Sequence, residues 1–115
     1  RAQKRFTDCP IILGGCARTG TSLLLSILAA HPRIFAFPTE TGVFSNWQYN
    51  GNSNEGSPKY VPERMDRLYR YILSHVIPKS ATHWCEKTPS NVRHIDKILA
   101  YFDHKVKFIH LIRDG

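Results

Sequence analysis

Short apolar runs punctuate the chain, each followed or preceded by proline, glycine or charged residues. Residues 10–14 (PIILG) and 34–37 (IFAF) are the first two, residues 83–86 (HWCE) form a weaker third, and residues 105–112 (KVKFIHLI) form the last. Runs of this kind are typical of strands that are buried on both faces of a parallel sheet. The pattern therefore predicts four short strands.

Between the first two runs, the apolar positions recur with the period of a helix. Residues 21–30 predict a helix with Leu24, Ile27 and Leu28 on one face, and the His-Pro pair at 31–32 ends it. Strand, glycine-rich loop and helix follow one another here.

Two more helices are predicted further along, each with proline in its first turn. The second begins at Pro62 and ends before Pro78, and the third begins at Pro89. The apolar stripe of the second is Met65, Leu68, Tyr69, Ile72 and Val76. The stripe of the third is Val92, Ile95, Leu99 and Phe102.

Residues 46–60 have no period of either kind. They are rich in Asn, Gly, Ser and Pro, which predicts a mobile surface loop. Strands that alternate with helices predict an α/β fold with a parallel sheet flanked by helices. In such folds ligands bind at the carboxyl ends of the strands.

The length and net charge of the chain limit the number of domains and the classes of ligand. The 115 residues allow one domain at most, and the apolar run at 108–112 is followed by a turn signal, so we expect a piece of something longer. A net charge of +7 favours anionic ligands. The basic residues are scattered and lack an RNA-binding signature, which argues against nucleic acid as the partner.

Three cysteines, Cys9, Cys16 and Cys85, have no C-x-x-C spacing, so we expect buried or partly buried thiols without a metal site. No apolar run is long enough for a membrane span and no signal peptide opens the chain.

The segment that follows the first strand carries the strongest chemical signal. Residues 14–22 read GGCARTGTS, a G-x-x-x-x-G loop in which Thr21 stands where a nucleotide-binding loop has lysine. The Arg18 guanidinium can donate two hydrogen bonds to one terminal anionic group of a ligand. The backbone N–H groups of the loop still form an anion-binding site. This predicts a loop for a small anionic group without a metal. The plain alternative is a glycine-rich turn with Arg18 in solvent.

Three stretches resemble sulfotransferases that use phosphoadenosine phosphosulfate (PAPS), nearest the heparan and tyrosylprotein sulfotransferase branch. They are PIILGGCARTGTSLLLSILAAHPRI, CEKTPSNVRHIDKI and KFIHLIRDG, in the family's order. The resemblance implies a single partial domain over 1–115, the N-terminal, donor-binding part of a sulfotransferase fold. The phosphosulfate loop is then at 14–22 and the 3′-phosphate strand and turn at 105–115.

The resemblance also implies roles for individual residues. The donor-binding set is Gly15, Cys16, Ala17, Arg18, Thr19, Gly20, Thr21, Ser22 and Arg113. Arg18 is expected at the leaving phosphate and Arg113 at the 3′-phosphate. Glu40 is expected to act as the general base, if burial raises its pKa, and Lys87 to stabilise the sulfuryl oxygens.

Each of these roles has a structural, non-catalytic alternative. Glu40 can be an exposed loop acid, Glu86 can pair with Lys87, and Arg113 can pair with Asp114. His31, His83 and His110 match no family position, so we interpret each as a capping or packing residue.

The reaction implied is sulfuryl transfer from PAPS, without a metal, to an unidentified hydroxyl or amine acceptor, leaving adenosine 3′,5′-bisphosphate. Two other functions stay open: a divergent P-loop kinase or NTPase with Asp114 as its magnesium ligand, and a non-catalytic domain that binds polyanions. The expected compartment is the bacterial cytoplasm, or the Golgi lumen if an anchor lies upstream.

Overall fold

A four-stranded parallel sheet forms the centre of the molecule. The computed structural model describes residues 5–15, 21–51 and 59–112. The strand order is β2-β5-β1-β6. The strands are β1 (Ile11–Gly15), β2 (Ile34–Ala36), β5 (His83–Lys87) and β6 (Lys107–Leu111). The four predicted strands and the predicted α/β class are confirmed.

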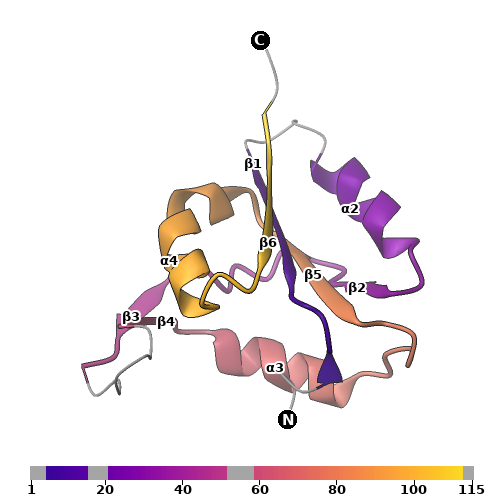
Figure 1. Ribbon diagram of the computed structural model, residues 1–115, viewed down its shortest axis with the longest axis horizontal. Helices are drawn as coiled ribbons and strands as arrows, with labels where there is room; N and C mark the ends of the chain where they lie inside the picture. Colours follow the sequence, from indigo (N-terminus) through magenta and orange to yellow (C-terminus); the bar gives the residue numbers. More distant parts are fainter. Residues whose placement is uncertain (1–4, 16–20, 52–58, 113–115) are drawn as a thin grey trace.

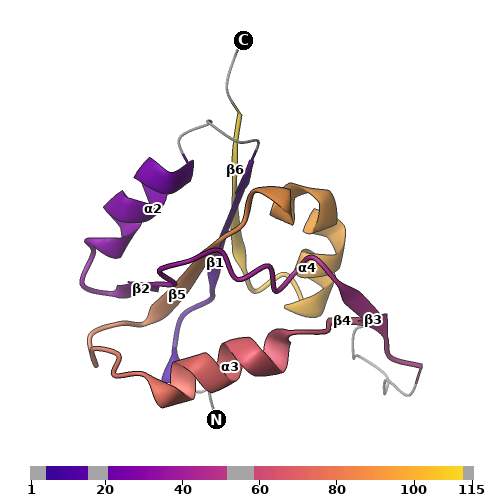
Figure 2. The same cartoon turned by 180° about the vertical axis from the view of Figure 1, so that it is seen from behind.

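Helices cover both faces of this sheet (Figures 1 and 2). α2 (Thr21–Ala29) packs on one face, while α3 (Met65–Ser74), the 3₁₀ helix η1 (Pro89–His94) and α4 (Ile95–Tyr101) lie on the other. The molecule therefore has three layers, as expected for a parallel sheet whose crossovers must run over its faces.

The continuous apolar runs arise because each strand faces two hydrophobic layers. In β1, Ile11 and Leu13 pack with Cys85 on the α2 side, whereas Ile12 packs with Trp84 on the α3 and α4 side. Side chains alternate between faces along a strand, so a strand covered on both faces needs an apolar residue at every position.

Parallel pairing brings the carboxyl ends of all four strands to the same side of the sheet. Leu13 in β1 lies opposite Lys87 in β5, and Gly15 lies opposite Leu111 in β6. Because every pairing is parallel, the segments that follow β1, β2, β5 and β6 all leave from one end of the sheet. We call this end the carboxyl edge; in Figure 1 β1 and β6 run upward to it.

The prediction of a mobile surface loop over residues 46–60 is wrong at both ends, where the chain forms strands. β3 (Trp47–Tyr49) and β4 (Tyr60–Pro62) pair antiparallel, and residues 52–58 lie outside the described residues. The rings of Tyr49 and Tyr60 meet edge to face at 5.4 Å. Strands of three residues are too short to show an alternation in the sequence, which is why the pairing was missed.

The predicted bounds of the second helix are also wrong. Pro62 belongs to β4, where it lies opposite Trp47, and the helix begins only at Met65. It ends at Ser74, because His75 is extended, with φ −112° and ψ 150°. Val76, predicted in the apolar stripe, is therefore fully exposed.

Two further apolar stripes need correction. On α2, Ile27 is 60% exposed, and Leu25 packs on the sheet in its place beside Leu24 and Leu28. The third predicted helix begins as η1 and continues as α4, and the fully buried Ile98 was absent from its predicted stripe. A 3₁₀ turn advances about 120° per residue, whereas an α-helix advances about 100°, so one 3.6-residue period cannot describe both.

Candidate functional site

The carboxyl edge is where the predicted site residues converge, as far as the structure describes them. Gly15 is the last residue of β1, and Thr21 begins α2, with Ser22 next. Cys16, Ala17, Arg18, Thr19 and Gly20 lie outside the described residues, as does Arg113. Their predicted roles therefore stay predictions.

Glu40 and Lys87 form an ion pair at this edge. Lys87 is the last residue of β5, and Glu40 lies in the segment after β2. Lys87 Nζ donates to Glu40 Oε2 at 3.0 Å, and the two side chains are 10% and 50% exposed respectively. Half of the Glu40 side chain thus remains open to a ligand, while Lys87 is held by its surroundings.

Glu86, the neighbour of Lys87, makes no ion pair with it; its carboxylate is fully buried in a hydrogen-bond network. Thr41 donates to Glu86 Oε2 through its backbone N–H at 3.0 Å and its hydroxyl at 2.8 Å. The Thr88 hydroxyl donates to the same oxygen at 2.5 Å, and Asn91 Nδ2 donates to Oε1 at 2.9 Å. The alternative in which Glu86 pairs with Lys87 is therefore wrong.

Two glycines allow the backbone to come together here. At Gly14 an added Cβ would lie 2.9 Å from Val92 Cγ1 and 3.0 Å from Val92 N, so η1 can cross β1 at this distance only over glycine. Gly42, two residues after Glu40, has φ +63°, a conformation that favours glycine. The segment after β2 turns at this residue.

The Cys85 thiol, next to Glu86 in β5, is inert. Burial, followed by the negative charge of Glu86, raises the pKa of Cys85 to about 12. Cys85 is fully buried and Cys9 is partly buried, both without a disulfide, as predicted for these two; Cys16 lies outside the described residues. A protonated, enclosed thiol packs like a small apolar side chain and has no part in the chemistry of this edge.

Sequence reasoning missed Thr41, Thr88 and Asn91, the side chains that hold Glu86. A weak signal was present in T-E-T and E-K-T-P-S-N, where short polar residues flank both candidate acids. Such residues usually cap helices or turns, so the sequence alone does not indicate that Thr41 meets Glu86 from 45 positions away.

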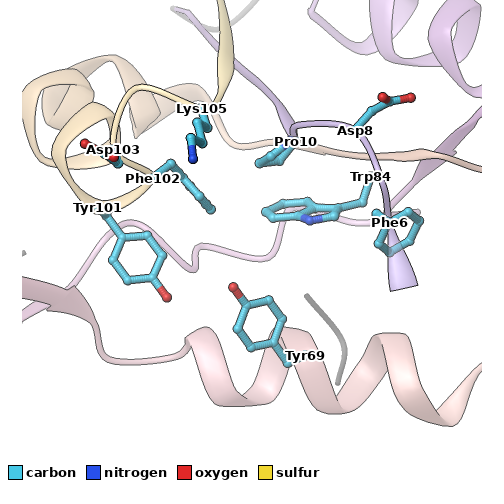
Figure 3. Close-up of a pocket in the computed structure, with 9 residues that line it drawn as sticks. All are labelled: Phe6, Asp8, Pro10, Tyr69, Trp84, Tyr101, Phe102, Asp103 and Lys105. Atoms are coloured by element: carbon cyan, nitrogen blue, oxygen red, sulfur yellow. The ribbon is translucent and has the colours of Figure 1, made fainter. Parts of the chain in front are cut away.

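A separate hollow lies away from this edge, beside the amino ends of β1 and β6 (Figure 3). Its volume is about 510 Å³. It is lined mainly by aromatic and charged side chains: Phe6, Asp8, Pro10, Tyr69, Trp84, Tyr101, Phe102, Asp103 and Lys105. Burial and the neighbouring Tyr69 raise the pKa of Tyr101. The hollow contains none of the predicted site residues.

Within the described part of the chain, no three His, Cys, Asp or Glu side chains gather as metal ligands would. Among the helices of residues 5–15, 21–51 and 59–112, none is both long and apolar enough to cross a membrane.

Comparison with known proteins gives the class to which this fold and site belong. Residues 10–115 match the Sulfotransferase family, so nearly the whole chain is covered. The chain belongs to this family, and the resemblance seen in the three sequence stretches is confirmed.

Within the family, the chain is similar to protein-tyrosine sulfotransferase 1 of Danio rerio. The two are 28% identical over 120 aligned positions, which cover 94% of this chain and 34% of the relative. The chain thus spans about a third of the length of that relative.

Proposed function

We propose that the protein transfers the sulfuryl group of PAPS to an acceptor hydroxyl or amine, and that the carboxyl edge holds the donor. The observation that carries this proposal is the Glu40–Lys87 ion pair at that edge, in a chain that belongs to the sulfotransferase family. The family match leaves the kinase and the polyanion-binding alternatives without support.

The residues present fit an anionic donor. Lys87 supplies an ammonium group at the end of β5, and α2 begins directly after residues 16–20, so its N-terminal N–H groups add partial positive charge. We carry over Arg18 and Arg113 from the family motif as further partners of the donor phosphates. No metal is needed to balance these charges in this proposal.

In the proposed step, the acceptor oxygen or nitrogen attacks sulfur, and the bond from sulfur to the bridging oxygen of the 5′-phosphate breaks. Glu40 takes the acceptor proton, Lys87 stabilises the sulfuryl oxygens, and Arg18 stabilises the leaving phosphate. The products are the sulfated acceptor and adenosine 3′,5′-bisphosphate. Negative charge builds on the bridging oxygen as its bond to sulfur breaks. Positioning of the reactants and electrostatic stabilisation of this charge therefore supply most of the catalysis.

The Glu40–Lys87 ion pair places the proposed base next to the proposed partner of the sulfuryl oxygens before the acceptor binds. It keeps the Glu40 carboxylate within 3.0 Å of the Lys87 ammonium, so base and sulfuryl partner are already adjacent. The Glu40 side chain is half exposed, so water partly screens the pair, whereas Lys87 is almost buried. Glu40→Gln keeps an oxygen that can accept from Lys87, so this substitution tests the chemistry with little effect on folding.

A peptide tyrosine is the acceptor that we propose to test first, because the relative is named a protein-tyrosine sulfotransferase. The bacterial cytoplasm, with the Golgi lumen as its alternative, stays a prediction.

Transfer from PAPS carrying a radiolabelled sulfuryl group tests the function directly. The full-length protein is expected to label a tyrosine peptide or a desulfated glycan, and a matched phenylalanine peptide tells whether the tyrosine hydroxyl is the acceptor. Labelling from ATP carrying a radiolabelled γ-phosphate, with none from PAPS, would instead indicate the divergent kinase.

Glu40→Gln tests the base. We expect kcat to fall about 100-fold or more, because general base catalysis contributes roughly that factor. The dissociation constant of adenosine 3′,5′-bisphosphate should change by less than about threefold, since the substitution removes no donor contact. Glu63→Gln, the same change at an exposed acid, is the matched control. Equal losses in turnover and in donor binding would remove Glu40 from the chemistry.

A further inference from the structure

We infer that Glu86 is a positioning residue: its buried carboxylate ties the segment that carries Glu40 to the end of the strand that carries Lys87. This inference rests on the proposed function, since it assigns Glu86 a part in the same site. It concerns a residue that does not itself touch the donor or the acceptor.

The first step is the placement of Glu86 between two segments. Thr41 comes from the segment after β2, whereas Thr88 and Asn91 follow β5. All three donate hydrogen bonds to the Glu86 carboxylate. Thr88 also accepts a bond from the Gly42 N–H at 3.3 Å, which adds a second tie between the same two segments.

The second step is the alternation of side chains at the end of β5. Trp84 and Cys85 pack on opposite faces of the sheet, so Glu86 and Lys87 must also point to opposite faces. Across the strand end, Thr41 binds Glu86 while its neighbour Glu40 binds Lys87. The segment after β2 is thus attached at two successive residues, one on each side of the strand.

The third step is that this position demands a carboxylate. Both oxygens of Glu86 face donors, and an ionised carboxyl group accepts only. Asn91 Nδ2 also donates to the Leu13 carbonyl at 3.0 Å, so both of its hydrogens are used. Among the described residues, the buried Asn91 Oδ1 is left without a partner. The Asn91 amide cannot be turned to accept from a glutamine at position 86 without losing the bond to Leu13.

A purely structural residue would not need this charge. Burying a carboxylate is costly unless several hydrogen bonds satisfy it, and well-packed apolar residues often replace buried ionic groups without loss of stability. What the network adds is a fixed geometry between Glu40 and Lys87, which a site for group transfer requires within a fraction of an ångström.

Glu86→Gln tests the tie in the ligand-free protein, through amide hydrogen exchange. The Thr41 and Gly42 amides donate into the network, so we expect their exchange to become at least about tenfold faster. The Leu68 amide in α3, which donates to the carbonyl of Arg64 at the start of that helix, serves as the internal reference and should keep its rate. Unchanged exchange at residues 41 and 42 would overturn the inference.

Kinetics then separate positioning from a general loss of folding. Glu86→Gln should lower kcat about tenfold or more in the natural background but less than about twofold in the Glu40→Gln background, because its effect acts through Glu40. Independent, multiplicative losses would overturn the inference.

Thr88 supplies a second pair of variants, in case Glu86→Gln does not fold. Thr88→Val removes the hydroxyl at nearly constant volume and should reproduce both effects, whereas Thr88→Ser keeps the hydroxyl and should stay close to the natural rates. A Thr88→Val protein with the natural exchange and kcat would contradict the inference. If the natural protein transfers nothing from PAPS, the proposed function fails, while the exchange measurements still decide whether Glu86 holds the segment.

Discussion

At the scale of single residues, Gly14 is a position where the neighbouring atoms leave no room for a side chain. Three atoms of η1, namely Val92 Cγ1, Val92 N and Asn91 Cβ, lie 2.9 to 3.2 Å from the place of an added methyl group. One of them is backbone, so the neighbour cannot simply rotate away. The close approach fixes η1, and with it Asn91, against the strand that precedes the predicted phosphosulfate loop.

Gly14→Ala should therefore destabilise the protein by about 1–3 kcal/mol, the usual cost of overpacking a core. Urea unfolding followed by tryptophan fluorescence measures the loss. Gly51→Ala is the matched control, because its added Cβ would meet only the exposed, movable ring of Tyr49. Equal stability of the two variants would mean that η1 does not press on β1 as described.

Candidate site residues were easier to name from the sequence than the partners of their side chains. Glu40 and Lys87 were named because they match family motifs, and the structure pairs them. Pairing of Glu86 with Lys87 was left open only as an alternative, because the two residues are adjacent in the sequence. In a strand, neighbours point to opposite faces, so a residue 47 positions away becomes the partner in its place.

At the scale of elements, α3 shows how one helix divides between core and solvent. Leu68 is 4% exposed and packs in the cluster that contains Phe37, Phe44 and Trp84. Leu73, on the same helix, is 59% exposed. The two leucines thus share a residue type and a helix but not an environment.

We expect Leu68→Ala to lower the free energy of unfolding by about 2–5 kcal/mol, through lost burial and the cavity that remains. Leu73→Ala should change it by less than about 0.5 kcal/mol, as is usual for surface positions. Thermal or urea unfolding of the two variants side by side measures the difference. A similar cost for both would contradict the assignment of the buried face.

Elements with a strong pattern were predictable, and elements that depend on distant contacts were not. β1, with an apolar residue at nearly every position, was predicted within one residue. The β3–β4 pair escaped prediction because its strands are only three residues long, and it also contacts distant residues such as Lys97, whose Nζ lies 4.8 Å from the centre of the Tyr60 ring. No pattern within residues 46–60 indicates this contact with Lys97.

At the scale of the whole molecule, the parallel sheet makes one site out of segments far apart in the chain. The segments after β1, β2, β5 and β6 all leave from the same edge, so the anionic donor that we propose would bind where several of them meet. A ligand that binds only the assembled edge stabilises the folded protein by mass action.

Adenosine 3′,5′-bisphosphate should therefore raise the melting temperature of the full-length protein without magnesium. At about 100 times its dissociation constant the ligand adds about 2.7 kcal/mol, which corresponds to a shift of several degrees. AMP, which lacks the 3′-phosphate, is the matched control and should have less effect. A shift with ATP and magnesium alone would contradict the proposed donor site.

The sequence by itself determined the elements with a clear hydrophobic period, the parallel α/β class and the family, because these depend on local pattern and on motifs of adjacent residues. Only the tertiary structure decided which charges meet. The Glu40–Lys87 pair and the burial of Glu86 depend on the register of parallel strands and on the face to which each side chain points. Both are set by packing between segments that no local pattern connects.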